Sequence, residues 1–134
     1  MAEINITSRP PFLKGKYKSY LLWSGLLFMY LYWVMLPEVL FVNGSGKTVD
    51  HINISIPGDD KVWRNIEHGK SKGFRYQPVR ETGSYNVAIT LSDGSLIRGT
   101  YNVIVPWDLG HKAIFELSPD LQLRADFNYS MFAY

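Results

Sequence analysis

The feature that most constrains this 134-residue chain is a run of nineteen uncharged residues, 19–37, with the sequence SYLLWSGLLFMYLYWVMLP. As an α-helix the run would measure roughly 28 Å, about the thickness of the hydrocarbon core of a bilayer. A helix packed on a globular core would instead show a polar stripe every three to four residues, and only Ser24 and Gly25 interrupt this run. The sequence therefore predicts a transmembrane helix over residues 19–37, which could extend to residue 42.

Basic residues on one side of the run indicate an orientation. Arg9, Lys14, Lys16 and Lys18 precede it, whereas only Lys47 lies within about ten residues after it. Positive charge stays on the cytoplasmic side, so we expect residues 1–18 to be a basic cytoplasmic tail and the following domain to be exported. A cleaved signal peptide is the alternative, but the apolar run is long for one and no small-x-small cleavage site follows it cleanly. A signal anchor is therefore favoured.

After residue 38 the hydrophobic period changes to the alternation typical of strands. The clearest pair covers residues 85–91 and 96–105, which flank Asp93-Gly94, the dipeptide that suits a type I′ hairpin turn. Alternation also occurs at residues 39–42, 52–56, 74–77, 112–117 and 121–131, which gives seven or eight strands spaced by roughly ten residues. We predict an all-β fold, an antiparallel immunoglobulin-like β-sandwich over residues 38–134, preceded by one N-terminal transmembrane helix.

Cysteine content and charge exclude several classes of protein. The chain has no cysteine, which rules out disulfides, thiolate zinc sites and iron–sulfur clusters. Its net charge of +2 is the sum of +3 from residues 1–18, −1 from Glu38 and zero from residues 43–134, so the domain lacks the basic footprint of a nucleic-acid-binding protein. An exported domain without disulfides is unusual for a eukaryotic secretory protein. The expected location is the bacterial inner membrane, single-pass, with a cytoplasmic N-terminus and a periplasmic C-terminal domain.

Sequence motifs for catalysis or cofactor binding are weak. Residues 44–48, GSGKT, resemble the end of a phosphate-binding loop, but Phe41 stands where that motif needs glycine and a strand pattern follows where it needs a helix, so we interpret them as a hairpin turn. His51, His68 and His111 lack metal-binding spacing, although they could converge with carboxylates in the fold. No nucleophile motif of the G-x-S-x-G or S-x-x-K type occurs. We expect no enzymatic activity, no catalytic residue, no cofactor and no metal, and a metal-binding domain is the least favoured alternative.

A few aromatic and basic side chains are candidates for contact with a partner. Trp107 lies in a Pro/Gly-containing loop, where an exposed aromatic residue typically anchors a partner, although it could equally fold back as a lid on the core. Phe132 and Tyr134 extend an aromatic last strand. Two further candidates come from the densest basic stretch of the domain, which contains Arg64, Lys70, Lys72, Arg75 and Arg80. The predicted partner-binding residues are Trp107, Phe132, Tyr134, Arg75 and Arg80.

Three segments, taken in order, contain a strand, a turn, an I-x-x-G-x-S-K hairpin and a strand that ends in Asp-Gly. They are FVNGSGKTVDHINISIPG, IEHGKSKGFRYQP and GSYNVAITLSDGS, and they cover about a third of the chain. In this pattern the chain resembles a group of small bacterial single-pass membrane proteins with a periplasmic immunoglobulin-like β-sandwich. The resemblance implies that architecture, and it implies no activity and no catalytic residue.

These features together favour a binding role over chemistry. The expected function is a membrane-anchored periplasmic protein-binding module, with a protein partner and with the bilayer contacting residues 19–37. The preferred version is an immunity-type protein that neutralises a toxin, because such a protein needs a complementary surface and no catalytic group. The alternative is an accessory or assembly subunit of an inner-membrane complex.

Overall fold

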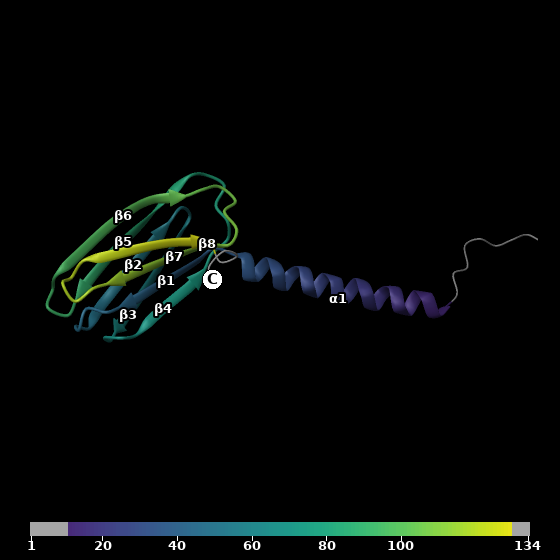
Figure 1. The fold of residues 1–134 in the computed structure, drawn as a ribbon, viewed down its shortest axis with the longest axis horizontal. Coiled ribbons are helices and arrows are strands. Elements are labelled where there is room, and N and C mark those ends of the chain that lie inside the picture. The colour runs from purple at the N-terminus through teal and green to yellow at the C-terminus, as the bar shows by residue number, and fades with distance from the viewer. Residues whose placement is uncertain (1–10, 130–134) are drawn as a thin grey trace, which may run out of the picture. The chain divides into compact units, whose positions relative to one another are not determined.

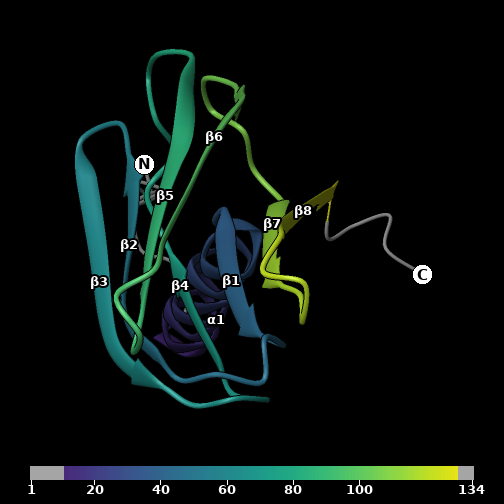
Figure 2. The ribbon, with the colours of Figure 1, turned by 90° about the vertical axis from the view of Figure 1, so that its left-hand side faces the viewer.

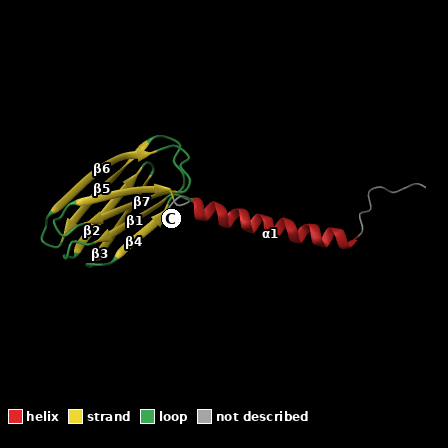
Figure 3. Ribbon diagram, viewed as in Figure 1, coloured by secondary structure: helices red, strands yellow, loops and turns green. Residues whose placement is uncertain are grey.

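The structure is a computed structural model that describes the backbone of residues 11–129 and the side chains of residues 16–128. Within residues 11–129, one helix precedes eight strands along the chain, and Figures 1 and 3 show how these elements follow one another. The chain divides into a helical unit that ends at Val34 and a β unit, Met35–Tyr134, which are described separately. The elements are α1 (Pro11–Met35), β1 (Glu38–Asn43), β2 (Val49–Ile56), β3 (Asp59–Ile66), β4 (Ser71–Arg75), β5 (Gly83–Leu91), β6 (Leu96–Ile104), β7 (His111–Leu117) and β8 (Leu123–Tyr129).

Helix α1 corrects the prediction of a membrane span. Within the part of the chain that the structure describes, no helix combines the length and the mean hydropathy needed to cross a bilayer. The reason lies in composition: Lys16 and Lys18 belong to the helix, and its Tyr and Trp side chains carry polar atoms, so counting uncharged residues overestimated how apolar it is. This finding overturns the predicted transmembrane helix and signal anchor at residues 19–37. It also overturns the single-pass inner-membrane location with a periplasmic domain, which depended on that helix.

The start of α1 also differs from the prediction. The helix begins at Pro11, a residue type suited to the first helical position because its missing N–H would have no intrahelical partner there. Residues 11–18, expected to belong to an N-terminal tail, are therefore helical. Residues 1–10 of that predicted tail lie outside the described residues.

The β unit is a sandwich of two four-stranded sheets (Figure 2). One sheet has the order β4-β1-β7-β8 and the other has the order β3-β2-β5-β6. The prediction of a β-sandwich is confirmed, but its antiparallel immunoglobulin-like form is wrong in two respects. β1 and β7 are parallel, and β1 and β2 lie in different sheets, whereas an immunoglobulin domain pairs its first two strands. Alternation of apolar residues determines which side chains face the core, and it does not determine which strands pair.

The hydrophobic core lies between the two sheets and follows the predicted alternation. Strand β5 has the burial pattern expected of a half-buried strand, since every second residue from Tyr85 to Leu91 is buried. The same alternation holds in β1, in β7 and in β2 from Ile52 onward. Side chains that are at most 2% exposed include Val39, Phe41, Val49, Ile52, Ile54, Ile66, Tyr85, Val87, Ile89, Leu91, Ala113, Phe115 and Leu117.

Sequence patterns identified one hairpin turn and missed one strand. The Asp93-Gly94 turn between β5 and β6 is confirmed, with Gly94 at a φ of +86° that suits glycine. β3 was not predicted, because it is an edge strand whose residues Asp59, Asp60 and Lys61 are all exposed. Charged residues are common on edge strands since they discourage pairing with other chains.

Asn43, at the end of β1, organises the crossing from the first sheet to the second. Its side chain is fully buried: Nδ2 donates to the carbonyl oxygens of Lys47 (2.8 Å) and Ile66 (2.9 Å), and Oδ1 accepts from the backbone N–H (3.1 Å) and hydroxyl (2.6 Å) of Ser45. Its backbone bonds to Gly69 and Lys70, before β4. Residues 44–48, expected to be a hairpin turn, thus form a cross-sheet connection.

Replacing Asn43 by alanine should destabilise the sandwich by about 3 kcal/mol, because buried donors and acceptors would lose their partners. The measurement is the free energy of unfolding from urea titration followed by tryptophan fluorescence. Asn102→Ala, the same substitution at an exposed position of β6, is the control and should stay within about 0.5 kcal/mol of the parent chain. Equal stabilities of the two variants would contradict the role given to Asn43.

Candidate functional site

Three connections meet at one end of the sandwich, here called the loop end. They are the β2–β3 turn (residues 57–58), the β4–β5 connection (residues 76–82) and the β6–β7 loop (residues 105–110). The strand registers place them together: Gly83 at the start of β5 pairs with Ile104 at the end of β6, and Ile56 pairs with Asp59 across the turn. The loop end is the candidate functional site.

The β6–β7 loop exposes apolar side chains. It holds three of the five large hydrophobic residues that are exposed in the described part of the sandwich, namely Val105, Trp107 and Leu109, of which Trp107 is 64% exposed. Trp107 is therefore not a lid on the core. Its φ of +57° lies in the left-handed region, which is strained for a bulky side chain. Its backbone N–H donates to the carbonyl oxygen of Val79 (2.9 Å), which fixes the loop against the β4–β5 connection.

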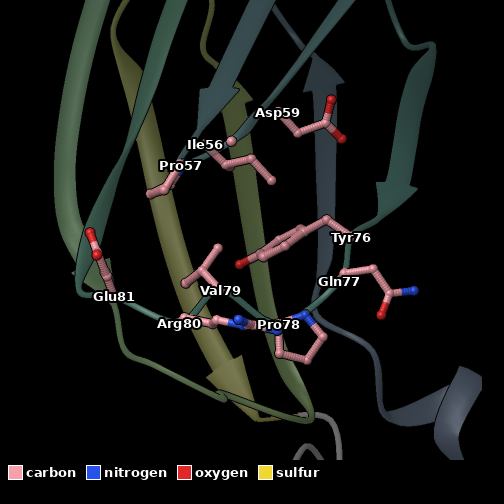
Figure 4. Close-up of a pocket in the computed structure, with 10 residues that line it drawn as sticks. Ile56, Pro57, Asp59, Tyr76, Gln77, Pro78, Val79, Arg80 and Glu81 are labelled. Carbon is pink, nitrogen blue, oxygen red and sulfur yellow. The ribbon is translucent and has the colours of Figure 1, made fainter.

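An open cleft of about 500 Å³ lies beside this loop. Figure 4 shows Ile56 and Pro57 on one side, Pro78 and Val79 on the other, and the Tyr76 ring between them. The charged lining residues are Asp59, Arg80 and Glu81.

The structure brings two of the predicted partner-binding residues to the loop end. Trp107 is bonded to Val79, and Arg80 follows directly in the wall of the cleft. Arg75, at the end of β4, instead pairs with Glu38 of β1 at 3.6 Å, with both side chains about 30% exposed (26% and 31%). The other two predicted residues, Phe132 and Tyr134, lie outside the described residues.

The three histidines lie in different surroundings. His51 on β2 bonds to Thr90, His68 accepts a hydrogen bond from the backbone of Gly46, and His111 lies in the core. Among residues 16–128, no group of three or more His, Cys, Asp or Glu side chains lies close enough to hold a metal ion.

A buried chain of polar groups supports the cleft from below. The Tyr76 hydroxyl in the cleft floor is 2.5 Å from the hydroxyl of Tyr85, which is 3.2 Å from Nδ1 of His111. The rings of Tyr85, His111 and Phe127 stack with centroids about 6 Å apart. The alternation over residues 85–91 predicted that Tyr85 faces the core, but the chain of polar groups was not predicted. A tyrosine at an inward-facing position could have indicated it, because a buried hydroxyl requires a hydrogen-bond partner.

Burial controls the ionisation of this chain. Desolvation raises the pKa of Tyr76 and Tyr85 above 10.0, because a phenolate would be poorly solvated there. Desolvation also lowers the pKa of His111 below 6.5, an effect that the negative charge of Asp108 partly offsets. The three groups are therefore neutral near pH 7 and hold the cleft floor without a buried charge.

Comparison with known proteins supports the fold and adds no activity. No protein-family model matches the sequence, and no match was found among curated proteins. Among solved structures, the chain is similar to a protein from Eubacterium rectale determined by NMR, with a TM-score of 0.51 and 13% sequence identity. The match covers 74% of this chain and 94% of that protein. At this identity the similarity shows the fold alone.

The sandwich should lose stability as the pH falls below about 6.5, because the unfolded chain takes up a proton that the folded state resists at His111. In the variants His111→Phe and His111→Gln, the fall in urea midpoint between about pH 7.5 and about pH 5 should be smaller than in the parent chain. Between about pH 7.5 and about pH 9, parent and variants should change in parallel. An unchanged acid dependence in both variants would refute this assignment.

Pro57 and Gly83 should be coupled in stability. A Cβ added at Gly83 would lie 2.2 Å from Cγ of Pro57, too close for two carbon atoms. Gly83→Ala should therefore destabilise the domain by about 2 kcal/mol, and the double variant Pro57→Ala/Gly83→Ala should recover most of that loss. A double-mutant cycle of unfolding free energies measures the coupling. Additive effects would show that Pro57 is not held against Gly83.

Proposed function

We propose that this chain is a protein-binding module without catalytic activity and that its partner binds the loop end. The observation that carries the proposal is the exposed apolar group Val105, Trp107 and Leu109 in one short loop. Tryptophan is enriched among the residues that dominate binding energy at interfaces, especially where other apolar side chains surround it. The cleft beside the loop adds a concave surface to this convex one.

The backbone at Trp107 supports the same proposal. A left-handed conformation at a bulky residue costs roughly 1–2 kcal/mol. Because the Trp107 side chain is exposed, its packing in the folded domain offsets little of this cost. Strain of this kind concentrates at binding sites, where the surrounding structure holds a side chain ready for contact. The hydrogen bond from Trp107 to Val79 provides that hold.

Helix α1 favours an accessory or assembly subunit as the form of this function. Between Tyr20 and Val34 every residue except Ser24 and Gly25 has a large aliphatic or aromatic side chain that is exposed in the helical unit, so these side chains lie on every face of the helix. A helix of this composition is stable in water only when other surfaces cover it, and a single packing partner covers only one stripe. Several elements of a larger assembly would satisfy this requirement. An immunity-type role uses the same loop end and differs in having a toxin as its partner.

Trp107→Ala should abolish partner capture and leave the fold intact. The experiment is affinity purification of the full chain from its native cells with quantitative mass spectrometry of the retained proteins. The matched control is Leu96→Ala, which removes another exposed apolar side chain at the opposite end of β6. The parent chain and the control should retain the same stoichiometric partner, and Trp107→Ala should retain at least about tenfold less of it.

Unfolding free energy is measured alongside, and Trp107→Ala should stay within about 0.5 kcal/mol of the parent chain. Equal capture by all three proteins would refute binding at the loop end, and a large loss of stability would show that Trp107 has a structural role. A component of a stable complex as the partner would support the accessory-subunit version, and a toxin would support the immunity-type version.

A further inference from the structure

We infer that the cleft at the loop end is a peptide-binding site, and that it takes an extended segment with an apolar side chain flanked by basic ones. The inference rests on the proposed function and specifies the chemistry of the partner. The cleft volume of about 500 Å³ lies within the range of about 300–1,000 Å³ usual for ligand sites. Its outline is open, which suits a chain that enters and leaves at its two ends (Figure 4).

The floor of the cleft suits an apolar side chain. Ile56, Pro57, Pro78 and Val79 surround the ring of Tyr76. Two of these residues are prolines, whose rings have little freedom, and Pro57 is packed against the backbone of Gly83. The Tyr76 side chain is only 5% exposed and its hydroxyl is bonded to Tyr85, so the floor offers an incoming side chain no free hydroxyl group. A rigid apolar floor loses little entropy on binding.

The charges of the cleft favour a basic peptide. Asp59 and Glu81 lie at opposite ends of it in Figure 4, and Arg80 lies between them along the wall. The lining therefore carries a net charge of −1, with a carboxylate at each end where a peptide chain would leave. A segment with a lysine or arginine on each side of its apolar residue would place one cation near each carboxylate.

Three synthetic peptides test this inference on the full-length chain. They are acetyl-Gly-Lys-Leu-Lys-Gly-amide, its acidic counterpart with Glu in place of Lys, and its polar counterpart with Ser in place of Leu. Binding is followed by amide chemical shifts of the ¹⁵N-labelled protein. The Lys-Leu-Lys peptide should shift the amides of Gly58, Val79 and Glu81 and should bind at least about fivefold more tightly than either counterpart.

Variants locate the charge contacts. Asp59→Asn and Glu81→Gln should each weaken binding of the Lys-Leu-Lys peptide about threefold. Glu67→Gln, the same kind of change at an exposed position beyond β3 at the opposite end of the sandwich, should leave it unchanged. Equal binding of the basic and acidic peptides, shifts confined to residues outside the cleft, or no binding of any peptide would overturn the inference.

The outcomes separate this inference from the proposed function. If Trp107→Ala abolishes partner capture while the peptides do not bind, the loop end binds a partner and the cleft does not bind a basic peptide segment. If the Lys-Leu-Lys peptide binds as expected while Trp107→Ala still captures the partner, the cleft is a peptide site and the proposed role of the loop fails.

Discussion

The arrangement of the sandwich depends on the hydrogen bonds of Asn43. The chain must leave β1 in one sheet and enter β2 in the other, and this crossing exposes backbone groups that no strand can satisfy. The buried amide of Asn43 satisfies them on both sides, because it joins the 45–47 segment to the end of β3. Gly44 then bonds to the last residue of β7. One side chain therefore fixes the relation between the two sheets at this end.

The opposite end of the sandwich has a different physical character. There two of the three connections are longer than those at the Asn43 end, apolar side chains are exposed in the β6–β7 loop, and a cleft opens beside it. The buried chain of Tyr76, Tyr85 and His111 connects the cleft floor to the first residue after that loop. Neutral hydroxyl and imidazole groups can make this connection without a buried charge, so the loop end keeps a defined shape while its surface stays open to a partner.

Local features of the fold were predicted from the sequence more accurately than the pairing of the strands. Alternation predicted most strands and their inward faces, and Asp93-Gly94 predicted a hairpin, because both depend on residues close in the chain. The parallel contact of β1 with β7, the charged edge strand β3 and the role of Asn43 depend on distant partners and were not predicted. The length of the uncharged run led to the wrong prediction of a transmembrane helix in the region of α1, because tyrosine and tryptophan are only partly apolar. Of the candidate site, Trp107 and Arg80 were identified from the sequence, whereas the cleft forms only when three separate connections meet.

The parallel pairing of β1 with β7 also affects how the domain folds. β1 lies at the centre of its sheet, yet residues 38–43 pair with residues 112–117, near the other end of the chain. During synthesis β1 therefore leaves the ribosome long before β7 exists. Its other neighbour, β4, and the sheet β3-β2-β5-β6 can form earlier. The chain between the two strands must lose the entropy of closing this long loop before β1 and β7 pair, so this pairing is expected to form late. Until then the apolar face of β1 needs protection from other chains.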